Sequence, residues 1–244
     1  MTCPFCRGEV QLEYNFCPSC SQPLRKRPTD ACLLLAFEDL AEGDFASARR
    51  QLEEIVRGDP GHIVALKALG NIYFRHGELD EAIATFRKLL EVDPKYIDVL
   101  YDLGVAYYYH GDLNEAAQFF RTLLRIAPDF QAALYRLGLT CFHLGLLDEC
   151  IAYLSSCVNL APGNLMARYH LAVAYFTQGD WERACREFKA VTLRTPENSA
   201  CFYQLGMAYK EYGEKKKALK AFQKSLQLEP KNQRVQKELS EIDS

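Results

Sequence analysis

The 244-residue sequence lacks the features that direct a protein into or across a membrane. It has no run of 18 or more apolar residues, so we expect no membrane-spanning helix. Its first ten residues, MTCPFCRGEV, contain no apolar core of the signal-peptide kind. An excess of positive charge is also missing, because 32 acidic and 29 basic residues give a net charge of −3. We therefore expect a cytoplasmic protein, and its bulk charge disfavours non-specific binding to nucleic acid.

Catalytic signatures are absent as well. The sequence contains no G-x-S-x-G elbow, no Walker loop, no H-E-x-x-H and no G-x-G-x-x-G. We therefore expect a protein that is not an enzyme and has no small-molecule substrate. Apolar residues make up 49% and charged residues 25% of the chain, which is typical of a folded soluble protein.

Two residue types recur along the chain at a spacing of 34 residues. One series consists of glycines: Gly43, Gly77, Gly111, Gly145, Gly179 and Gly213. The other consists of prolines: Pro60, Pro94, Pro128, Pro162, Pro196 and Pro230. Such a period indicates stacked copies of one small structural unit. It predicts six repeats: 29–62, 63–96, 97–130, 131–164, 165–198 and 199–232.

Each repeat contains two helical patterns, and the second repeat illustrates both. Its first half places small or apolar residues on one helix face, at Leu66, Leu69, Gly70 and Tyr73. Gly77 ends this helix because glycine tolerates the left-handed backbone conformation. Its second half has an apolar stripe at Ala82, Phe86 and Leu89. Pro94 closes that half because proline cannot continue a helix, so each repeat is predicted to be a helical hairpin.

The same places are filled in a characteristic way in the third repeat, by Leu103, Gly104, Tyr107, Ala116, Phe120 and Pro128. This arrangement resembles the tetratricopeptide (TPR) pattern W-x₂-L-G-x₂-Y…A-x₃-F…P. No repeat has the tryptophan. The fourth repeat has Cys141, Cys150 and Leu154 in the places of Tyr, Ala and Phe, and the first has Ala36 and Asp39 in those of Gly and Tyr.

The resemblance implies an all-α fold, a TPR α-solenoid in which helical hairpins form a right-handed superhelix over residues 29–232. The tail, residues 233–244, mixes charge with Val235, Leu239 and Ile242. We expect it to be a capping helix that covers the last repeat with a polar outer face.

Four cysteines stand at the start of the chain in the spacing C-x₂-C-x₁₀-C-x₂-C: Cys3, Cys6, Cys17 and Cys20. Two such pairs can place four thiolates at tetrahedral corners around one Zn²⁺. Between the pairs, apolar residues alternate in the manner of strands, at Val10, Leu12, Tyr14 and Phe16. A segment this small cannot form a sufficient core alone, so the metal would contribute most of its folding energy.

This segment resembles a bacterial-type zinc ribbon, and Pro4, Pro18 and Leu24 also fit that pattern. Arg7 and Ser21 replace the glycines that usually follow each cysteine pair. We expect a four-cysteine zinc ribbon at residues 1–24 and a basic linker at 25–28. Two disulfides or a redox dithiol are the alternatives for these cysteines.

The side of the first helices opposite their buried stripe is predicted to be aromatic. The fifth place of four successive repeats is a tyrosine: Tyr101, Tyr135, Tyr169 and Tyr203. The twelfth place holds Tyr108, Phe142 and Phe176. Polar residues lie among them: Lys67, Asn71, Asp102, Arg136, His143 and His170. In TPR proteins this side lines an inner groove for peptides or helices, so the resemblance implies that these residues bind a partner.

Two other interpretations of this face stay open. The rings could pack between neighbouring first helices, which would leave only their edges exposed. One TPR sub-family clamps a C-terminal carboxylate, and Lys67, Asn71 and Arg136 match its pattern. Asp102 and Ala132 stand where that pattern has Asn and Lys, and an acid there would repel the carboxylate.

Taken together, these patterns predict a protein–protein interaction scaffold with the zinc ribbon as a second contact module. One alternative is an RNA- or ribosome-associated factor that uses the ribbon and the C-terminal lysine patch around residues 215–217. Nucleic acid is the less favoured partner because the ribbon is not basic overall. The other alternative is a thiol or metal-handling protein.

Overall fold

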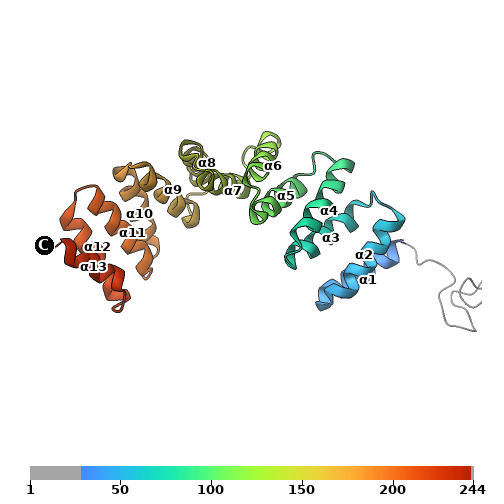
Figure 1. Cartoon of the computed structure of the whole chain (residues 1–244), viewed down its shortest axis with the longest axis horizontal. Helices are drawn as coiled ribbons and strands as arrows, with labels where there is room; N and C mark the ends of the chain where they lie inside the picture. Colours follow the sequence, from blue (N-terminus) through green and yellow to red (C-terminus); the bar gives the residue numbers. More distant parts are fainter. Residues whose placement is uncertain (1–28, 243–244) are drawn as a thin grey trace, which may run out of the picture. The chain divides into compact units, whose positions relative to one another are not determined.

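The computed structural model describes residues 29–242, which form thirteen α-helices and no strand (Figure 1). The predicted zinc ligands Cys3, Cys6, Cys17 and Cys20 lie outside these residues, as do the rest of the predicted ribbon and the linker. None of the thirteen helices is long and apolar enough to span a bilayer.

The chain divides into two compact bodies at Pro94. The described part of the N-terminal body, residues 29–94, consists of two hairpins. Its helices are α1 (Thr29–Glu42), α2 (Phe45–Gly58), α3 (Ile63–Arg75) and α4 (Leu79–Val92). Helix α1 packs on α2, α2 on α3, and α3 on α4, so each hairpin buries the apolar stripe of the next.

The described part of the C-terminal body, residues 95–242, continues the same pattern through four hairpins and one further helix. The first two hairpins are α5 (Ile97–His110) with α6 (Leu113–Ile126), and α7 (Gln131–His143) with α8 (Leu147–Leu160). The next two are α9 (Leu165–Gln178) with α10 (Trp181–Arg194), and α11 (Ser199–Glu211) with α12 (Lys215–Leu228). Helix α13 (Gln233–Ile242) follows, and the second helix of each hairpin packs on the element after it.

A glycine and a large side chain bring the two helices of most hairpins together. A Cβ atom added to Gly104 would lie 2.6 Å from a ring carbon of Phe120, and one on Gly206 would lie 2.5 Å from Phe222. Both rings are fully buried. The two helices therefore approach closely at this place, which explains why it holds glycine.

The fourth repeat keeps this contact with different residues. Gly138 faces Leu154 instead of a ring, and a Cβ atom there would meet the leucine side chain at 2.7 Å. Cys141 and Cys150 are fully buried, as the Tyr and Ala places require. The departures from the pattern therefore change which atoms fill the core without opening the hairpin.

A second glycine makes the turn between the two helices. Gly111 has φ +100° at the end of α5, in the left-handed region, and its N–H donates to the carbonyl oxygen of Tyr107. A residue with a Cβ atom would be strained there. This turn explains the glycine series seen in the sequence.

The tail covers one end of the C-terminal body. Val235 of α13 is fully buried against Ala218 and Phe222, with Leu239 and Ile242 packed around them. This contact provides the apolar cover that was expected for the last hairpin. The right-handed superhelix concerns the path of the whole array and stays a prediction.

We expect Gly104→Ala to lower the free energy of unfolding by about 1–3 kcal/mol, because the added methyl group overlaps the buried Phe120 ring. Urea unfolding followed by circular dichroism measures this difference. Gly163→Ala is the matched control, because nothing lies within 4 Å of its added Cβ atom. Equal stability of the two variants would contradict the close-approach explanation.

Candidate partner-binding face

The predicted groove residues all lie on first helices of hairpins. Lys67 and Asn71 are on α3 in the N-terminal body, and the others are on α5, α7, α9 and α11 in the C-terminal body. Their side chains are half-buried, apart from Asn71 and His143, which are exposed. The aromatic residues of this face are therefore neither sealed in the core nor fully in water.

Three of the tyrosines rest on the second helix of their own hairpin. The ring of Tyr101 lies 6.0 Å from that of Phe120, Tyr169 lies 5.7 Å from Phe188, and Tyr203 lies 5.9 Å from Phe222. These contacts extend the buried aromatic core toward the surface. Packing therefore accounts for part of each ring.

Tyr135 instead joins two neighbouring first helices. Its ring, on α7, lies 5.7 Å from His170 on α9, and its hydroxyl oxygen is 3.4 Å from the ring Nδ1. The same Nδ1 lies 2.8 Å from the carbonyl oxygen of Met166. His170 thus connects α7 to the first turn of α9. Among the four tyrosines at the fifth place, all within residues 29–242, Tyr135 alone packs between neighbouring first helices through a ring contact with His170.

Arg136 is surrounded by three tyrosines of α5, and together they form the tyrosine–arginine cluster: Tyr101, Tyr108, Tyr109 and Arg136. The guanidinium carbon lies 5.8 Å from the ring centre of Tyr108 and 5.6 Å from that of Tyr109. Burial opposes the charge of this guanidinium, but the neighbouring hydroxyl groups of Tyr101 and Tyr109 favour it, and its pKa is raised. A guanidinium over tyrosine rings is stabilised by cation–π attraction.

The positive charge in this cluster has no acidic partner. Within residues 29–242, none of the ion pairs includes Arg136. Helices α7 and α9 contain no Asp or Glu at all, although α5 carries Asp98 and Asp102. Arg168, the other arginine of these two helices, is paired with Glu187 at 2.6 Å. Arg136 is therefore a half-buried cation held by rings and hydroxyl groups.

Burial also sets the protonation of the phenols on this face. It raises the pKa of Tyr108, Tyr135 and Tyr169 above the usual value for tyrosine. At neutral pH these hydroxyl groups keep their protons. They can donate a hydrogen bond as well as accept one.

The remaining predicted aromatic residues have local contacts. The Phe142 ring is 6.0 Å from His143, whose own ring is 5.8 Å from Tyr108. Phe176 lies 5.2 Å from Trp181 at the start of α10. The structure thus brings Tyr108, Phe142 and His143 into the neighbourhood of the tyrosine–arginine cluster.

Sequence reasoning missed one residue of this site. Tyr109 is 56% exposed and contacts both Tyr108 and Arg136, yet it was not among the predicted groove residues. The sequence feature that could have identified Tyr109 is its position directly after Tyr108, on the same outward side of the helix.

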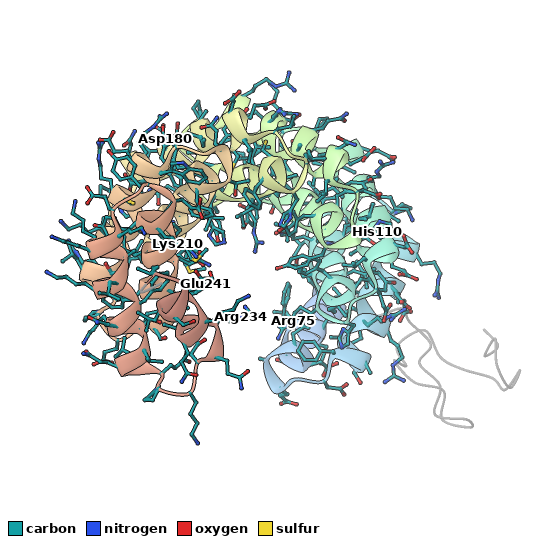
Figure 2. The ribbon with its side chains drawn as sticks, turned by 60° about the vertical axis from the view of Figure 1, so that its left-hand side comes forward. Arg75, His110, Asp180, Lys210, Arg234 and Glu241 are labelled. Carbon is teal, nitrogen blue, oxygen red and sulfur yellow. The ribbon has the colours of Figure 1, made fainter. Side chains whose placement is uncertain are left out.

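Lys210, near the C-terminal lysine patch, is paired with the last helix. Its Nζ donates to Glu238 at 2.5 Å and to Glu241 at 3.1 Å, both on α13. Figure 2 shows Lys210 beside Glu241. The bond to Glu238 is the main cause of the raised pKa of Lys210. Lys217 is likewise paired with Glu214. The patch is therefore weaker as a nucleic-acid site than the sequence implied.

The cysteines of the C-terminal body lie in its core. Burial raises the pKa of Cys141 to about 11, that of Cys150 to about 12 and that of Cys185 to about 11. It also raises the pKa of Cys157 and Cys201. No group of three or more His, Cys, Asp or Glu residues within 29–242 could hold a metal ion.

Comparison with known families identifies the repeats. Models of the tetratricopeptide repeat match residues 70–111, 101–164, 165–189 and 199–232. The chain contains TPR repeats. No curated protein sequence matches it.

Several solved TPR structures are similar to this chain. MamA aligns with a TM-score of 0.66 and 25% identity over 69% of this chain and 92% of its own. YrrB, described as a TPR protein with an unusual peptide-binding site, aligns with a TM-score of 0.69 and 23% identity over 76% and 96%. Pseudomonas aeruginosa pilF aligns with a TM-score of 0.67 and 19% identity over 87% and 97%. The last two likenesses show the TPR fold alone.

We expect the core thiols to resist alkylation of the native protein at pH 7.5. With pKa values of about 11, about 12 and about 11, Cys141, Cys150 and Cys185 are thiolates in fewer than about one molecule in a thousand. Iodoacetamide labelling followed by peptide mass spectrometry measures this. The half-buried Cys32 is the internal control and should be labelled in the native protein. The core thiols should be labelled only in denaturant. Rapid native labelling of Cys150 would support the thiol-protein alternative.

Proposed function

We propose that this chain is a non-enzymatic adaptor that binds a segment of a partner protein over the first helices of its C-terminal body. The observation that carries the proposal is the tyrosine–arginine cluster. TPR proteins generally mediate protein–protein interaction, and the solved structure of YrrB is described as having a peptide-binding site. The partly exposed rings supply large apolar area with few rotatable bonds, as binding surfaces commonly do.

The charge of this face favours a partner segment that is extended or helical and carries an acidic side chain. Arg136 is pre-positioned by the phenols, and a guanidinium can bind a carboxylate through two parallel hydrogen bonds. The absence of Asp and Glu from α7 and α9 removes repulsion from those helices. Exposed Tyr109 beside Arg136 would contact the apolar neighbours of that acid.

Within this proposal the acid is an internal Asp or Glu rather than a C-terminal carboxylate. The clamp for a chain end requires Asn and Lys where this chain has Asp102 and Ala132. Arg136 is the single cation of α7 that matches that clamp. One bidentate ion pair within an aromatic surface suits a side-chain carboxylate, which needs no clamp around a chain end.

Selection of peptides from a random 12-residue library tests both parts of this proposal. We expect the full-length protein to enrich peptides that combine acidic with aromatic or aliphatic residues. Arg136→Glu should weaken binding of a selected acidic peptide about 10-fold to 100-fold, because a charged hydrogen-bonded pair is lost. In a new selection that variant should enrich basic peptides. Fluorescence polarisation measures the affinities.

Arg125→Glu is the matched control, because Arg125 is an exposed arginine on α6. It should leave both selection and affinity unchanged. Arg136→Gln serves as a second variant if the charge reversal unfolds the protein, as judged by thermal melting. Enrichment of neutral peptides would overturn the acidic partner alone, and no enrichment would overturn peptide binding by this face.

We also propose that Cys3, Cys6, Cys17 and Cys20 bind one structural Zn²⁺ and that the resulting ribbon is a second contact module. The support is their spacing, C-x₂-C-x₁₀-C-x₂-C, which suits a tetrahedral thiolate site. Two linked modules that engage one assembly would raise avidity. The thiolates themselves would carry the metal, and no catalytic step is assigned to it.

Native mass spectrometry tests the zinc site. We expect one bound zinc per chain, lost in the Cys3→Ser/Cys6→Ser variant, while helicity by circular dichroism barely changes. Cys141→Ser/Cys150→Ser should keep the zinc, because those thiols lie in the helical core. Undiminished zinc in the first variant would refute this ligand set, and two disulfides by mass would favour the oxidised alternative.

A further inference from the structure

Helix α1 presents an apolar surface that no described element covers. Leu34 is 66% exposed and Phe37 is 43% exposed. They are three residues apart, so they lie on the same face of the helix. Residues 29–242 contain no element before α1 that could cover them.

The repeat period shows which way Leu34 faces. Among the residues at its place in later repeats, at multiples of 34 residues, are Arg136 and His170. Arg136 contacts Tyr108 and His170 contacts Tyr135, and in both cases the contacted ring is on the preceding first helix. This place therefore faces the repeat before it. In α1 it faces the position that a preceding repeat would occupy.

In the last repeat, the corresponding apolar surface is covered by α13. Val235 is fully buried against the last hairpin, and Lys210 fixes the helix through ion pairs with Glu238 and Glu241. Terminal repeats require such polar-faced caps, because an open end exposes apolar surface. The first repeat has an equivalent open side and 28 preceding residues.

We propose that the N-terminal segment, residues 1–24, packs against Leu34 and Phe37 and caps the first repeat. The five peptide steps from Leu24 to Thr29 span at most about 18 Å. Leu34 and Phe37 lie roughly 7 and 12 Å along α1 from its first residue. A compact segment of 24 residues has a radius of gyration of about 7 Å, so it can reach both residues.

The segment also has a matching apolar surface. Val10, Leu12, Tyr14 and Phe16 alternate along the sequence, so in an extended conformation they share one face. The short tether gives this face a high local concentration at α1, which favours it over a second copy of the chain. This cap goes beyond partner binding by the C-terminal body.

Hydrogen exchange of the full-length, zinc-loaded protein tests the cap. We expect the amides of residues 33–41 to exchange about tenfold or more faster in Leu34→Glu than in the parent protein, because the cap is displaced. Cys3→Ser/Cys6→Ser should accelerate the same amides, because the proposed zinc supplies most of the folding energy of the segment. Exchange in α5–α13 should be unchanged in both variants.

Leu193→Glu is the matched control, because Leu193 is 73% exposed on α10 and far along the sequence from α1. It should leave exchange of residues 33–41 unaltered. Unchanged exchange of α1 in Leu34→Glu would overturn the proposal. So would a dimer, by light scattering, that Leu34→Glu dissociates while its zinc content and the exchange of residues 1–24 stay the same. Peptide binding at Arg136 is measured separately, so failure of the cap does not bear on it.

Discussion

The close approach of two helices within each hairpin is the contact on which the rest of the structure depends. Gly104 leaves space for the Phe120 ring, and Gly206 does the same for Phe222. Because the second helix sits this close, the apolar stripe of the first helix is buried within the hairpin and against its neighbours. A larger residue at the glycine would push the helices apart and loosen both contacts.

This packing also determines which side of the first helices stays available. Once the stripe containing Leu103 and Tyr107 is buried, the opposite side must face away from the second helix. Tyrosines on that side rest partly on the core and partly on one another, so their rings are held in place. Arg136 lies over the rings of Tyr108 and Tyr109, which makes its charge part of an ordered surface.

Repeats that bury surface only against neighbours leave open sides at both ends of the array. In the C-terminal body α13 closes one side with Val235 and the ion pairs of Lys210. Leu34 marks the corresponding side of the first repeat. The capping and partner-binding surfaces are thus consequences of the same nearest-neighbour stacking.

The sequence by itself determined the helical hairpins, because the spacing of Gly111, Phe120 and their equivalents encodes turns and contacts local to one repeat. It also placed Tyr135 and Arg136 on the outward side of a helix. Only the tertiary structure decided which side chains meet across helices: Tyr135 with His170, and Arg136 with the tyrosines of α5. The pairing of Lys210 with α13 was hidden for the same reason. Such contacts depend on how successive helices pack, and the period of a single helix carries no information about that packing.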